Sequence, residues 1–313
     1  MTRAFVFPGQ GSQAVGMGRE LAEQFADARA VFQEVDEALG QNLSSLIFEG
    51  PESELTLTEN AQPALMAVSL AVLRVLEVQG GLDLARAAVF VAGHSLGEYS
   101  ALAAAHSFAV ADAARLLKRR GQAMQRAAPV GAGAMAALLG LELAAAREVA
   151  ADARQGQVCD AANDNAAGQV VVSGDKAAVE RAIALAAARG ARRSILLPVS
   201  APFHCALMAP AAAVMRAALA EVSIAPPIVP LVANVTAAAE REPDTIRRLL
   251  VEQVTGLVRW RESVLFMKEA GVTSLVEIGA GKVLSGLAKR IDRDVTAVSI
   301  QSPADIEAFL HSP

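Results

Sequence analysis

The sequence predicts an α/β fold in which a large domain with a parallel sheet carries a second, small domain inserted within it. Three observations support this. Short apolar stretches of strand length alternate with amphipathic stretches of helix length in the first and last parts of the chain, which is typical of a parallel sheet covered by helices. The order of strands and helices changes after Pro129 and changes back after Pro198. An apolar strand also runs directly into GHSLG at residues 93–97, where a helical pattern begins.

The first part of the chain begins the parallel sheet. Residues 4–7 (AFVF) form a short strand pattern that leads into the glycine-rich loop FPGQGSQAVGMG. The helical stretch at 61–78 is apolar on most sides, so we expect it to be buried. The elements predicted here are strand 4–7, helices 19–39 and 61–78, strand 87–92, and helices 97–106 and 110–127.

The middle of the chain, residues 129–197, is predicted to form the small domain. Pro129, Gly131 and Gly133 mark its beginning and Pro198 follows its end, because proline and glycine interrupt regular structure. The predicted elements have the order βαββαβ, that of the ferredoxin-like unit. They are strand 134–139, helix 142–154, strands 157–162 and 168–173, helix 175–189 and strand 191–197.

The end of the chain returns to the large domain, which we predict to consist of residues 1–128 and 198–313. A proline-rich extended piece, APPIVPLVANV, separates its first helix from the later elements, and no internal repeat is visible. The predicted elements are helix 206–221, helices 243–254 and 260–270, strand 273–278, helix 283–291 and strand 295–300.

The composition argues against a disordered, fibrous or membrane protein. Hydrophobic residues make up 53% of the chain, too many for a disordered or fibrous protein. Residues 65–73 (LMAVSLAVL) are the most lipid-like stretch, but Arg74 and Glu77 follow them, and a membrane span needs about 18 apolar residues. The start of the chain lacks the apolar core of a signal peptide. We therefore expect a soluble, cytoplasmic protein that does not contact a membrane.

Charge and residue counts argue against nucleic-acid and metal-binding functions. The net charge of −5 argues against general nucleic-acid binding, and one Trp and one Tyr offer little surface for stacking bases. The two cysteines and four histidines show no metal-ligand spacing. We expect no nucleic-acid partner, no structural zinc, no disulfide framework and no cofactor.

The sequence GHSLG fits the G-x-S-x-G pattern of a nucleophile elbow, which predicts an α/β-hydrolase-like large domain. A serine at a sharp turn from strand to helix has its hydroxyl exposed at the sheet edge. Glycines at 93 and 97 remove the Cβ atoms that would collide there. The helix start directs free N–H groups toward Ser95, and the N–H of Leu96 would stabilise an oxyanion. The alternative is an ordinary tight turn, and we favour Ser95 as nucleophile.

A serine nucleophile needs a base, and His204 is selected by elimination. An elbow points the side chains of His94 and Glu98 away from the hydroxyl. His106 lies near a helix end, and His311 lies in a tail that we expect to be frayed. His204 follows strand 191–197, from which a loop could reach the active edge. The alternative is a buried histidine bonded to backbone. No aspartate is a compelling third member, so a backbone carbonyl could orient the imidazole.

The stretch GHSLGEYSAL and several motifs elsewhere resemble the malonyl-CoA:acyl-carrier-protein transacylase family, whose nucleophile motif is GHSxGE. The motifs occur in the family's order and span nearly all 313 residues. They are FPGQGSQ near the start, RG-x-x-M at 120–124, GAMAALLG at 133–140, N-x-N with QVVVSG at 163–174, PVSAPFHCALM at 198–208 and EIGAGKVLSGL at 277–287.

The resemblance implies roles for residues around the serine. Gln10 resembles the glutamine that lines the oxyanion pocket, beside the Leu96 N–H. Gln253 resembles a second glutamine, near which a backbone carbonyl orients the imidazole of the active histidine. Arg120 resembles the arginine that pairs with the free carboxylate of malonate. The residues alone would place Arg120 on a solvated basic helix face. The bulky Phe203 would disfavour an α-methyl branch on the acyl group.

The resemblance implies ping-pong transfer of malonyl from malonyl-CoA to the phosphopantetheine thiol of acyl carrier protein, through a malonyl-serine ester, for fatty-acid synthesis. Service to a polyketide synthase, or use of another acyl-CoA, stays open. A serine thioesterase or esterase is a weaker alternative. The loop GQGSQA lacks the second strand of a dinucleotide site, and a non-catalytic carrier-binding module would not need Ser95 and His204.

The same family implies a monomer that docks an acidic carrier protein. Because the chain has a net charge of −5, docking would need a local basic patch. Solvated charges that balance acidic neighbours are the alternative for each residue. The candidates are Arg189, Arg192, Arg193, Lys282, Lys289 and Arg290.

Overall fold

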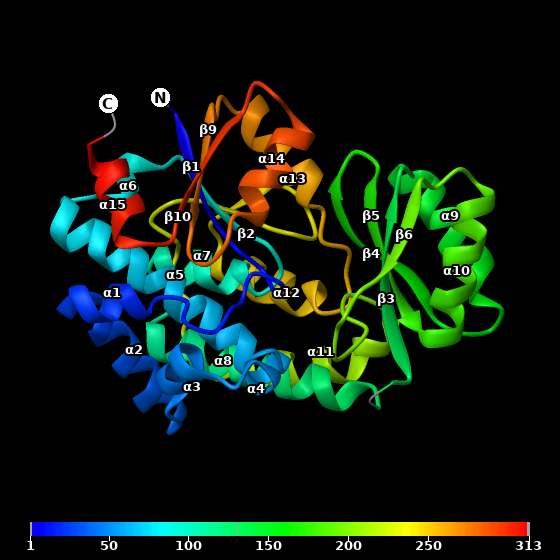
Figure 1. Ribbon diagram of the computed structural model, residues 1–313, viewed down its shortest axis with the longest axis horizontal. Helices are drawn as coiled ribbons and strands as arrows, with labels where there is room; N and C mark the ends of the chain where they lie inside the picture. Colours follow the sequence, from blue (N-terminus) through cyan, green and yellow to red (C-terminus); the bar gives the residue numbers. More distant parts are fainter. Residues whose placement is uncertain (1, 130, 312–313) are drawn as a thin grey trace.

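The computed structural model describes residues 2–129 and 131–311 and contains two β-sheets. A six-stranded sheet has the order β10-β9-β1-β2-β7-β8 and a four-stranded sheet the order β4-β5-β3-β6. In Figure 1 the four-stranded sheet with its two helices lies to the right of the larger α/β body. The predicted α/β fold, with a parallel-rich sheet and a small βαββαβ unit, is confirmed.

The larger sheet is parallel except at one edge. Strand β1 lies between β9 and β2, and β2 pairs with β7. All these pairs and β10–β9 are parallel, whereas β7–β8 is antiparallel. Phe7 at the end of β1 pairs with Gly93 at the end of β2, so the loops after both strands leave the same sheet edge. The strands are β1 (Arg3–Phe7), β2 (Phe90–Gly93), β7 (Leu231–Val232), β8 (Ala239–Glu240), β9 (Ser274–Ile278) and β10 (Thr296–Ile300).

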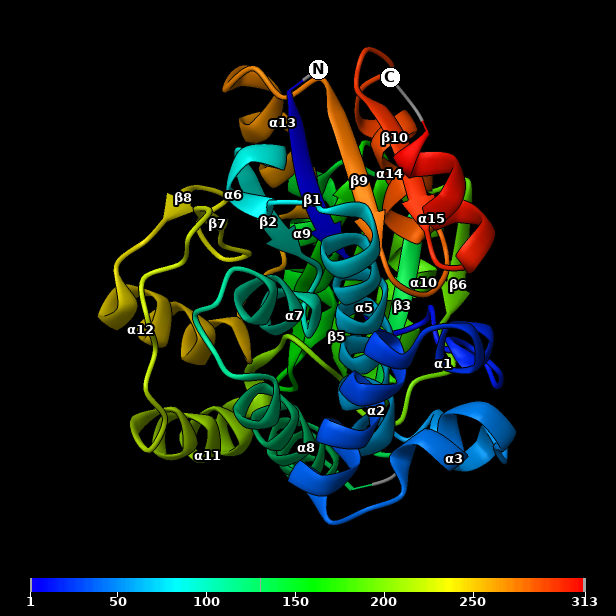
Figure 2. The ribbon, with the colours of Figure 1, turned by 90° about the vertical axis from the view of Figure 1, so that its left-hand side faces the viewer.

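Helices cover both faces of this sheet, as a buried parallel sheet requires. Successive residues of β1 point to opposite faces: Phe5 and Phe7 join one apolar cluster, and Ala4 and Val6 another. Figure 2 shows α5 and α7 against one face of the sheet. The helices on that side include α1 (Arg19–Gln24), α2 (Ala26–Leu39), α5 (Thr58–Gly80), α7 (Gly97–Ala104), α8 (Val110–Ala127), α11 (Ala209–Ala220) and α12 (Pro243–Gln253). The other face packs against α13 (Trp260–Glu269) and α14 (Val283–Ile291).

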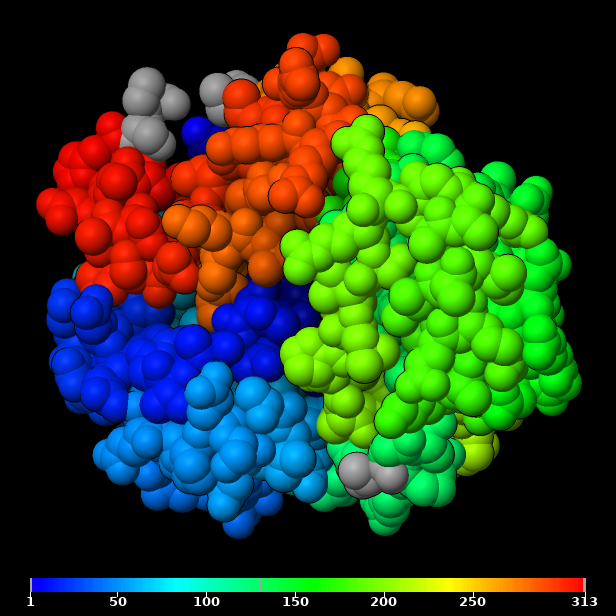
Figure 3. All heavy atoms as spheres, turned by 45° about the vertical axis from the view of Figure 1, so that its right-hand side comes forward, coloured from blue at the N-terminus to red at the C-terminus, as the bar shows by residue number. Residues whose placement is uncertain are grey.

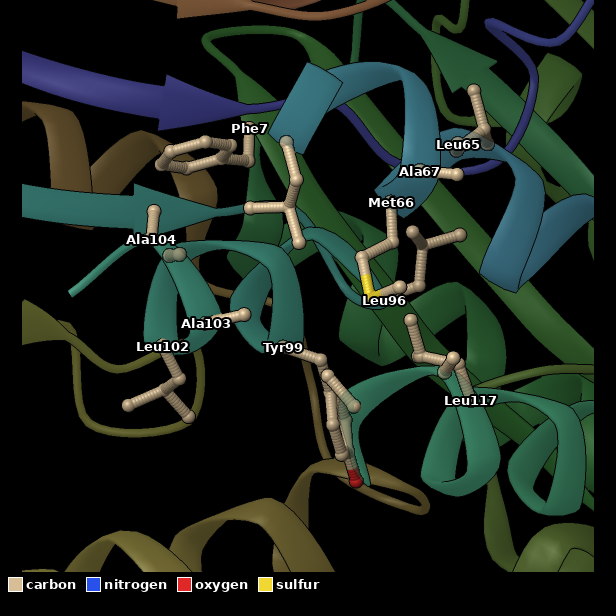
Figure 4. Packing of buried hydrophobic residues seen from close by; sticks show 14 of the residues in the cluster. Phe7, Leu65, Met66, Ala67, Leu96, Tyr99, Leu102, Ala103, Ala104 and Leu117 are labelled. Carbon is tan, nitrogen blue, oxygen red and sulfur yellow. The ribbon is translucent and has the colours of Figure 1, made fainter. Parts of the chain in front are cut away.

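Helix α5 is the centre of the larger core. Its residues Leu65 and Met66 are fully buried. Figure 4 shows Met66 pointing toward Leu96 of the elbow, with Leu117 of α8 nearby. Within the described residues it is the one helix long and apolar enough to cross a membrane, but most of it is buried inside the protein. Its apolar composition therefore reflects the core, as the sequence predicted.

The four-stranded sheet is antiparallel throughout and has helices on one face. Its strands are β3 (Gly133–Leu139), β4 (Cys159–Ala166), β5 (Gln169–Asp175) and β6 (Arg193–Leu196). Helices α9 (Leu143–Arg154) and α10 (Lys176–Ala188) share an apolar cluster with one face. The opposite face places Met135 and Val171 in the larger cluster, so this sheet turns one side toward the α/β body.

The structure corrects the sequence prediction in several places. The single helix expected at 19–39 is two helices, because Phe25 has extended backbone between them. The tail expected to be frayed forms α15 (Pro303–Leu310), whose start is closed by a capping box of Ser302 and Asp305. The sequence also did not predict several short elements. These are α3 (Leu43–Glu49), α4 (Glu52–Leu55), α6 (Leu84–Ala87), β8 and the 3₁₀ turn η1 (Ala206–Met208) before α11.

Candidate active site

Ser95 lies at a strained turn between β2 and α7. Its φ of 54° is in the left-handed region, which is costly for any residue with a side chain. Asn234 holds this turn from two sides, because its Oδ1 accepts from Ser95 N at 2.8 Å and its Nδ2 donates to Gly93 O at 2.7 Å. The turn therefore keeps the serine in a conformation that an unrestrained chain would leave.

The two glycines of the motif are required by close backbone contacts. A Cβ at Gly93 would lie 1.9 Å from the carbonyl carbon of Gly97, and one at Gly97 would lie 2.3 Å from Phe7 O. Gly97 C and Phe7 O are backbone atoms of closely packed elements, so moving either of them would cost much free energy.

We expect Gly97→Ala to lower the free energy of unfolding by about 3 kcal/mol or more, because overpacking against backbone cannot relax easily. Gly286→Ala is the matched control. Gly286 is an exposed residue inside α14, and a Cβ there would meet nothing within 4 Å. The control should raise stability by about 0.5–1 kcal/mol, as alanine favours helix over glycine. Urea unfolding followed by circular dichroism measures both. Equal stability changes in the two variants would contradict the close-packed elbow.

His204 lies within hydrogen-bond distance of Ser95. The Ser95 Oγ and His204 Nε2 atoms are 2.7 Å apart, and His204 Nδ1 is 2.9 Å from the backbone carbonyl oxygen of Gln253. A carbonyl can only accept, so Nδ1 carries the proton and Nε2 is free to accept the serine proton. A backbone carbonyl thus occupies the place that an aspartate has in a Ser-His-Asp triad.

The surroundings keep His204 neutral. The side chain is buried, with 3% of its surface exposed. Burial first, and then the positive charge of Arg120, lower the pKa of His204 to about 3. The imidazole is therefore unprotonated at ordinary pH, which is the state that a general base needs before it accepts a proton.

Arg120 is buried and points toward the serine. Only 1% of its surface is exposed. Its Nη2 donates to Ser95 Oγ at 3.1 Å and to Gln253 Oε1 at 2.8 Å, and its Nη1 donates to Gln62 Oε1 at 2.8 Å. The solvated helix face that the residues alone suggested is therefore wrong. Burial lowers the pKa of Arg120, but an arginine still keeps its charge.

Among the described residues, the guanidinium of Arg120 has only neutral hydrogen-bond partners. Within residues 2–129 and 131–311, no carboxylate lies within 4.0 Å of a nitrogen of Arg120, whereas the neighbouring Arg119 pairs with Glu221 at 2.8 Å. A buried cation is costly without a counter-charge. Arg120 is therefore a buried cation without a counter-charge among the described residues.

The other predicted residues lie around the same space. Gln10 follows β1, and its Oε1 accepts from Thr58 Oγ1 at 2.9 Å. Leu96 is the N-cap of α7, where backbone N–H groups lack partners within the helix. Phe203 is buried beside His204. All three, with Ser95 and His204, line one cavity.

This cavity of about 670 Å³ lies between the two sheets. The α/β body contributes the loop after β1, the elbow, Arg120 and the first turns of α14, and the small sheet contributes Met135, Asn163, Asn165 and Val171. Figure 3 shows the surface hollowed where the blue N-terminal, orange C-terminal and yellow-green segments meet. His94 and Asn165 join the two sides of the cavity through a 2.9 Å contact between Nε2 and Oδ1. The cavity is large enough for an extended small molecule.

Comparison with known proteins decides the family. A family model described as "Acyl transferase domain" matches residues 4–299. The malonyl CoA-acyl carrier protein transacylase of Escherichia coli (strain K12) is 47% identical over 307 residues, which cover 98% of this chain and 98% of that protein. The chain belongs to the malonyl-CoA:acyl-carrier-protein transacylase family.

Solved structures similar to this transacylase share its whole fold. An acyl-carrier-protein-S-malonyltransferase from Bartonella henselae is 56% identical with a TM-score of 0.96, and the match covers 99% of this chain and 98% of that one. A malonyl-transacylase solved in complex with its type II PKS acyl-carrier protein is 42% identical with a TM-score of 0.95, covering 99% of each chain. The family resemblance and fold predicted from the sequence are confirmed.

Sequence reasoning gave no role to three residues that contact the predicted site residues. Gln62 of α5 accepts from Arg120, and its only signal in the sequence was a polar residue in a helix that is apolar on most sides. Asn234 follows β7 and fixes the elbow, but no local pattern distinguishes it. Glu98 was set aside as a base, and it indeed lies away from the hydroxyl, where its carboxylate contacts Gln253.

Proposed function

We propose that the protein transfers the malonyl group of malonyl-CoA to the phosphopantetheine thiol of acyl carrier protein, through an ester on Ser95. The observation that carries this proposal is Arg120, a buried cation that has no ionic partner among the described residues and donates to Ser95 itself. A guanidinium can hold a carboxylate with two parallel hydrogen bonds. The site therefore suits an acyl group with a free carboxylate, as malonyl has.

The chemistry follows from the geometry of the dyad. His204 Nε2 takes the proton as Ser95 Oγ bonds to the thioester carbon, and the carbonyl oxygen becomes an oxyanion. We propose that the Leu96 N–H and Gln10 stabilise this oxyanion. The carbon–sulfur bond then breaks, and coenzyme A leaves with the proton from His204. The carrier thiol reverses these steps: His204 takes its proton, sulfur attacks the ester, and Ser95 regains a proton.

A serine thioesterase would use the same elbow and dyad, but it would have no use for a buried, unpaired arginine beside the serine. The position of Arg120 beside Ser95 would hold a carboxylate-bearing acyl group on the enzyme until a thiol arrives. This arrangement favours transfer to a thiol. Phe203 at the cavity wall supports a preference for malonyl over methylmalonyl, since one added methyl costs about 1–3 kcal/mol in a tight pocket.

The function is tested by offering malonyl-, methylmalonyl- and acetyl-CoA together with holo acyl carrier protein. Mass spectrometry of the carrier should show mainly malonyl, and free malonate should form more slowly than malonyl carrier. Free acid as the main product would support the thioesterase instead. Loading of acetyl as fast as malonyl would contradict the carboxylate site. Carrier proteins from fatty-acid and polyketide synthases, assayed side by side, report which pathway the protein supplies.

We further propose that the carrier protein docks on exposed basic residues, of which Lys282 lies next to the cavity. Of the candidates, Arg189 is engaged by Asp152 and Glu148, and Arg290 donates to Gln169. The other four, Arg192, Arg193, Lys282 and Lys289, are exposed and form no salt bridge within the described part of the chain. Lys282 directly precedes Val283, which lines the cavity.

We expect the charge reversal R192E/R193E to raise the KM for the carrier protein while leaving the KM for malonyl-CoA unchanged, because exposed charges steer a charged partner. Arg86→Glu is the matched control. Arg86 is highly exposed on α6, which precedes β2, so it lies toward the sheet edge opposite the elbow. Steady-state kinetics at low salt measures both variants. An unchanged carrier KM in R192E/R193E would refute docking at these residues.

We also propose that residues 129–197 form a small domain and residues 1–128 and 198–313 a large one. The separate apolar cluster between α9, α10 and the four-stranded sheet supports this division. We propose that the protein acts as a monomer in the cytoplasm.

A further inference from the structure

Glu98 is a buried carboxyl below the nucleophile that the proposed mechanism does not use. It lies in the first turn of α7 with 1% of its surface exposed. Its Oε2 accepts from Gln253 Nε2 at 2.7 Å and from the backbone N–H of Asn234 at 3.3 Å. Its Oε1 is buried and has no hydrogen-bond partner among the described residues. A buried acid that is only half satisfied calls for a reason beyond packing.

The side-chain amide of Gln253 connects this carboxyl to the arginine. Gln253 Nε2 donates to Glu98 and also to Ser95 O at 2.8 Å, while Gln253 Oε1 accepts from Arg120 Nη2 at 2.8 Å. An amide can donate only from its nitrogen and accept only at its oxygen. Glu98 Oε2 and Ser95 O both accept from the amide nitrogen, and Arg120 donates to the amide oxygen, so all three contacts select the same orientation of the amide. Among the described residues, Glu98 is the one side chain on the acceptor side that carries a carboxyl.

We propose that Glu98 is a positioning residue, which holds Gln253 Oε1 against Arg120 and thereby aims the guanidinium at the malonyl carboxylate beside Ser95. This inference rests on the proposed function and adds to it. If the amide of Gln253 turned over, Nε2 would face Arg120 and two donors would oppose each other. The guanidinium would then lose one of the acceptors that fix its direction.

The indirect contact is better suited to this role than an ion pair. A carboxylate bound directly to Arg120 would occupy the nitrogens that the substrate needs, whereas Glu98 acts through a neutral amide and leaves the cation unpaired. Burial raises the pKa of Glu98 to about 7, and the hydrogen bonds from Gln253 and Asn234, followed by the charge of Arg120, oppose that rise. Oε2 can accept in either protonation state, because the proton can sit on the unpartnered Oε1. The role thus depends on an acceptor oxygen, and a carboxamide should replace it.

Two variants of the full chain test whether Glu98 acts through its acceptor oxygen or through its charge. Glu98→Gln keeps an acceptor oxygen without the charge, and Glu98→Met keeps the length and volume without a good acceptor. Acylation of Ser95 by malonyl-CoA and by acetyl-CoA is followed by intact-protein mass spectrometry. We expect E98M to lose about 10- to 100-fold in kcat/KM for malonyl-CoA, mainly through KM, and less than about threefold for acetyl-CoA. E98Q should stay within about threefold of the unmodified protein for both substrates.

Glu277→Met is the matched control, because Glu277 is also a fully buried carboxyl and accepts from the N–H groups of Leu284 and Ser285, outside the contacts of Gln253. It should lower the melting temperature. Because Leu284 lines the cavity, both acylation rates can fall together, but the ratio of malonyl to acetyl rates should stay unchanged. Equal losses with malonyl and acetyl in E98M would overturn the positioning role, as would an E98Q as impaired as E98M. If E98M does not fold, E98Q alone decides, since a large malonyl-specific loss there overturns the role. A protein without malonyl transfer before mutation would instead refute the proposed function.

Discussion

Replacing Ser95 with alanine is expected to abolish the acyl-enzyme and to lower malonyl transfer by on the order of 10⁴- to 10⁶-fold. The hydroxyl oxygen of Ser95 lies 2.7 Å from Nε2 of the neutral His204 imidazole. Alanine removes this hydroxyl, so His204 has no serine proton to accept and no acyl ester can form. Arg120 and the cavity remain, so malonyl-CoA should still bind. Intact-protein mass spectrometry after mixing with malonyl-CoA should show an adduct on the unmodified protein and none on the variant.

Ser100→Ala provides the control for this experiment. Ser100 is a buried serine on the same helix, α7, and its Oγ has no hydrogen-bond partner in the part of the chain that the structure describes. Its loss should leave the adduct in place, since it removes a hydroxyl of the same kind without touching His204. A malonyl adduct that persists in S95A would move the nucleophile to another residue.

The elbow could be predicted because its determinants are local. A strand, two glycines and a helix start follow each other within residues 90–97, and each leaves a mark in the sequence. The same reasoning failed for the end of the chain, where α15 is short and its capping box spans Ser302 and Asp305. It also failed at residues 43–55, where two short helices carry too few turns for a periodic pattern.

The burial of Arg120 could not be predicted from the residues next to it in the sequence. Lys118 and Arg119 beside it have acidic partners and remain partly exposed, as a solvated helix face predicts. Arg120 is buried because Gln62 of α5 and Gln253 of α12 bring acceptors from distant parts of the chain. Only the family resemblance indicated its place. Contacts of this range depend on how helices pack, which periodicity along one helix does not reveal.

Replacing Arg120 with alanine is expected to reduce malonyl transfer by roughly 10²- to 10³-fold, while acetyl transfer changes far less. Under the proposed function, the variant lacks the guanidinium that would pair with the substrate carboxylate, and removing one partner of a buried ion pair is costly. Arg120→Lys should recover part of the activity at most, because an ammonium cannot reproduce two parallel hydrogen bonds. The rates of Ser95 acylation by malonyl-CoA and acetyl-CoA, measured by mass spectrometry on one preparation, give the ratio directly.

The acetyl reaction serves as an internal control for the base. The charge of Arg120 is the second cause, after burial, that lowers the pKa of His204, so its removal makes the imidazole a stronger base and leaves it buried and neutral near pH 7. Acylation by a neutral substrate should therefore survive in R120A, and its share of the total should rise. If malonyl and acetyl rates fall by the same factor, Arg120 supports the structure of the site instead of reading the carboxylate, and the malonyl preference must come from elsewhere in the cavity.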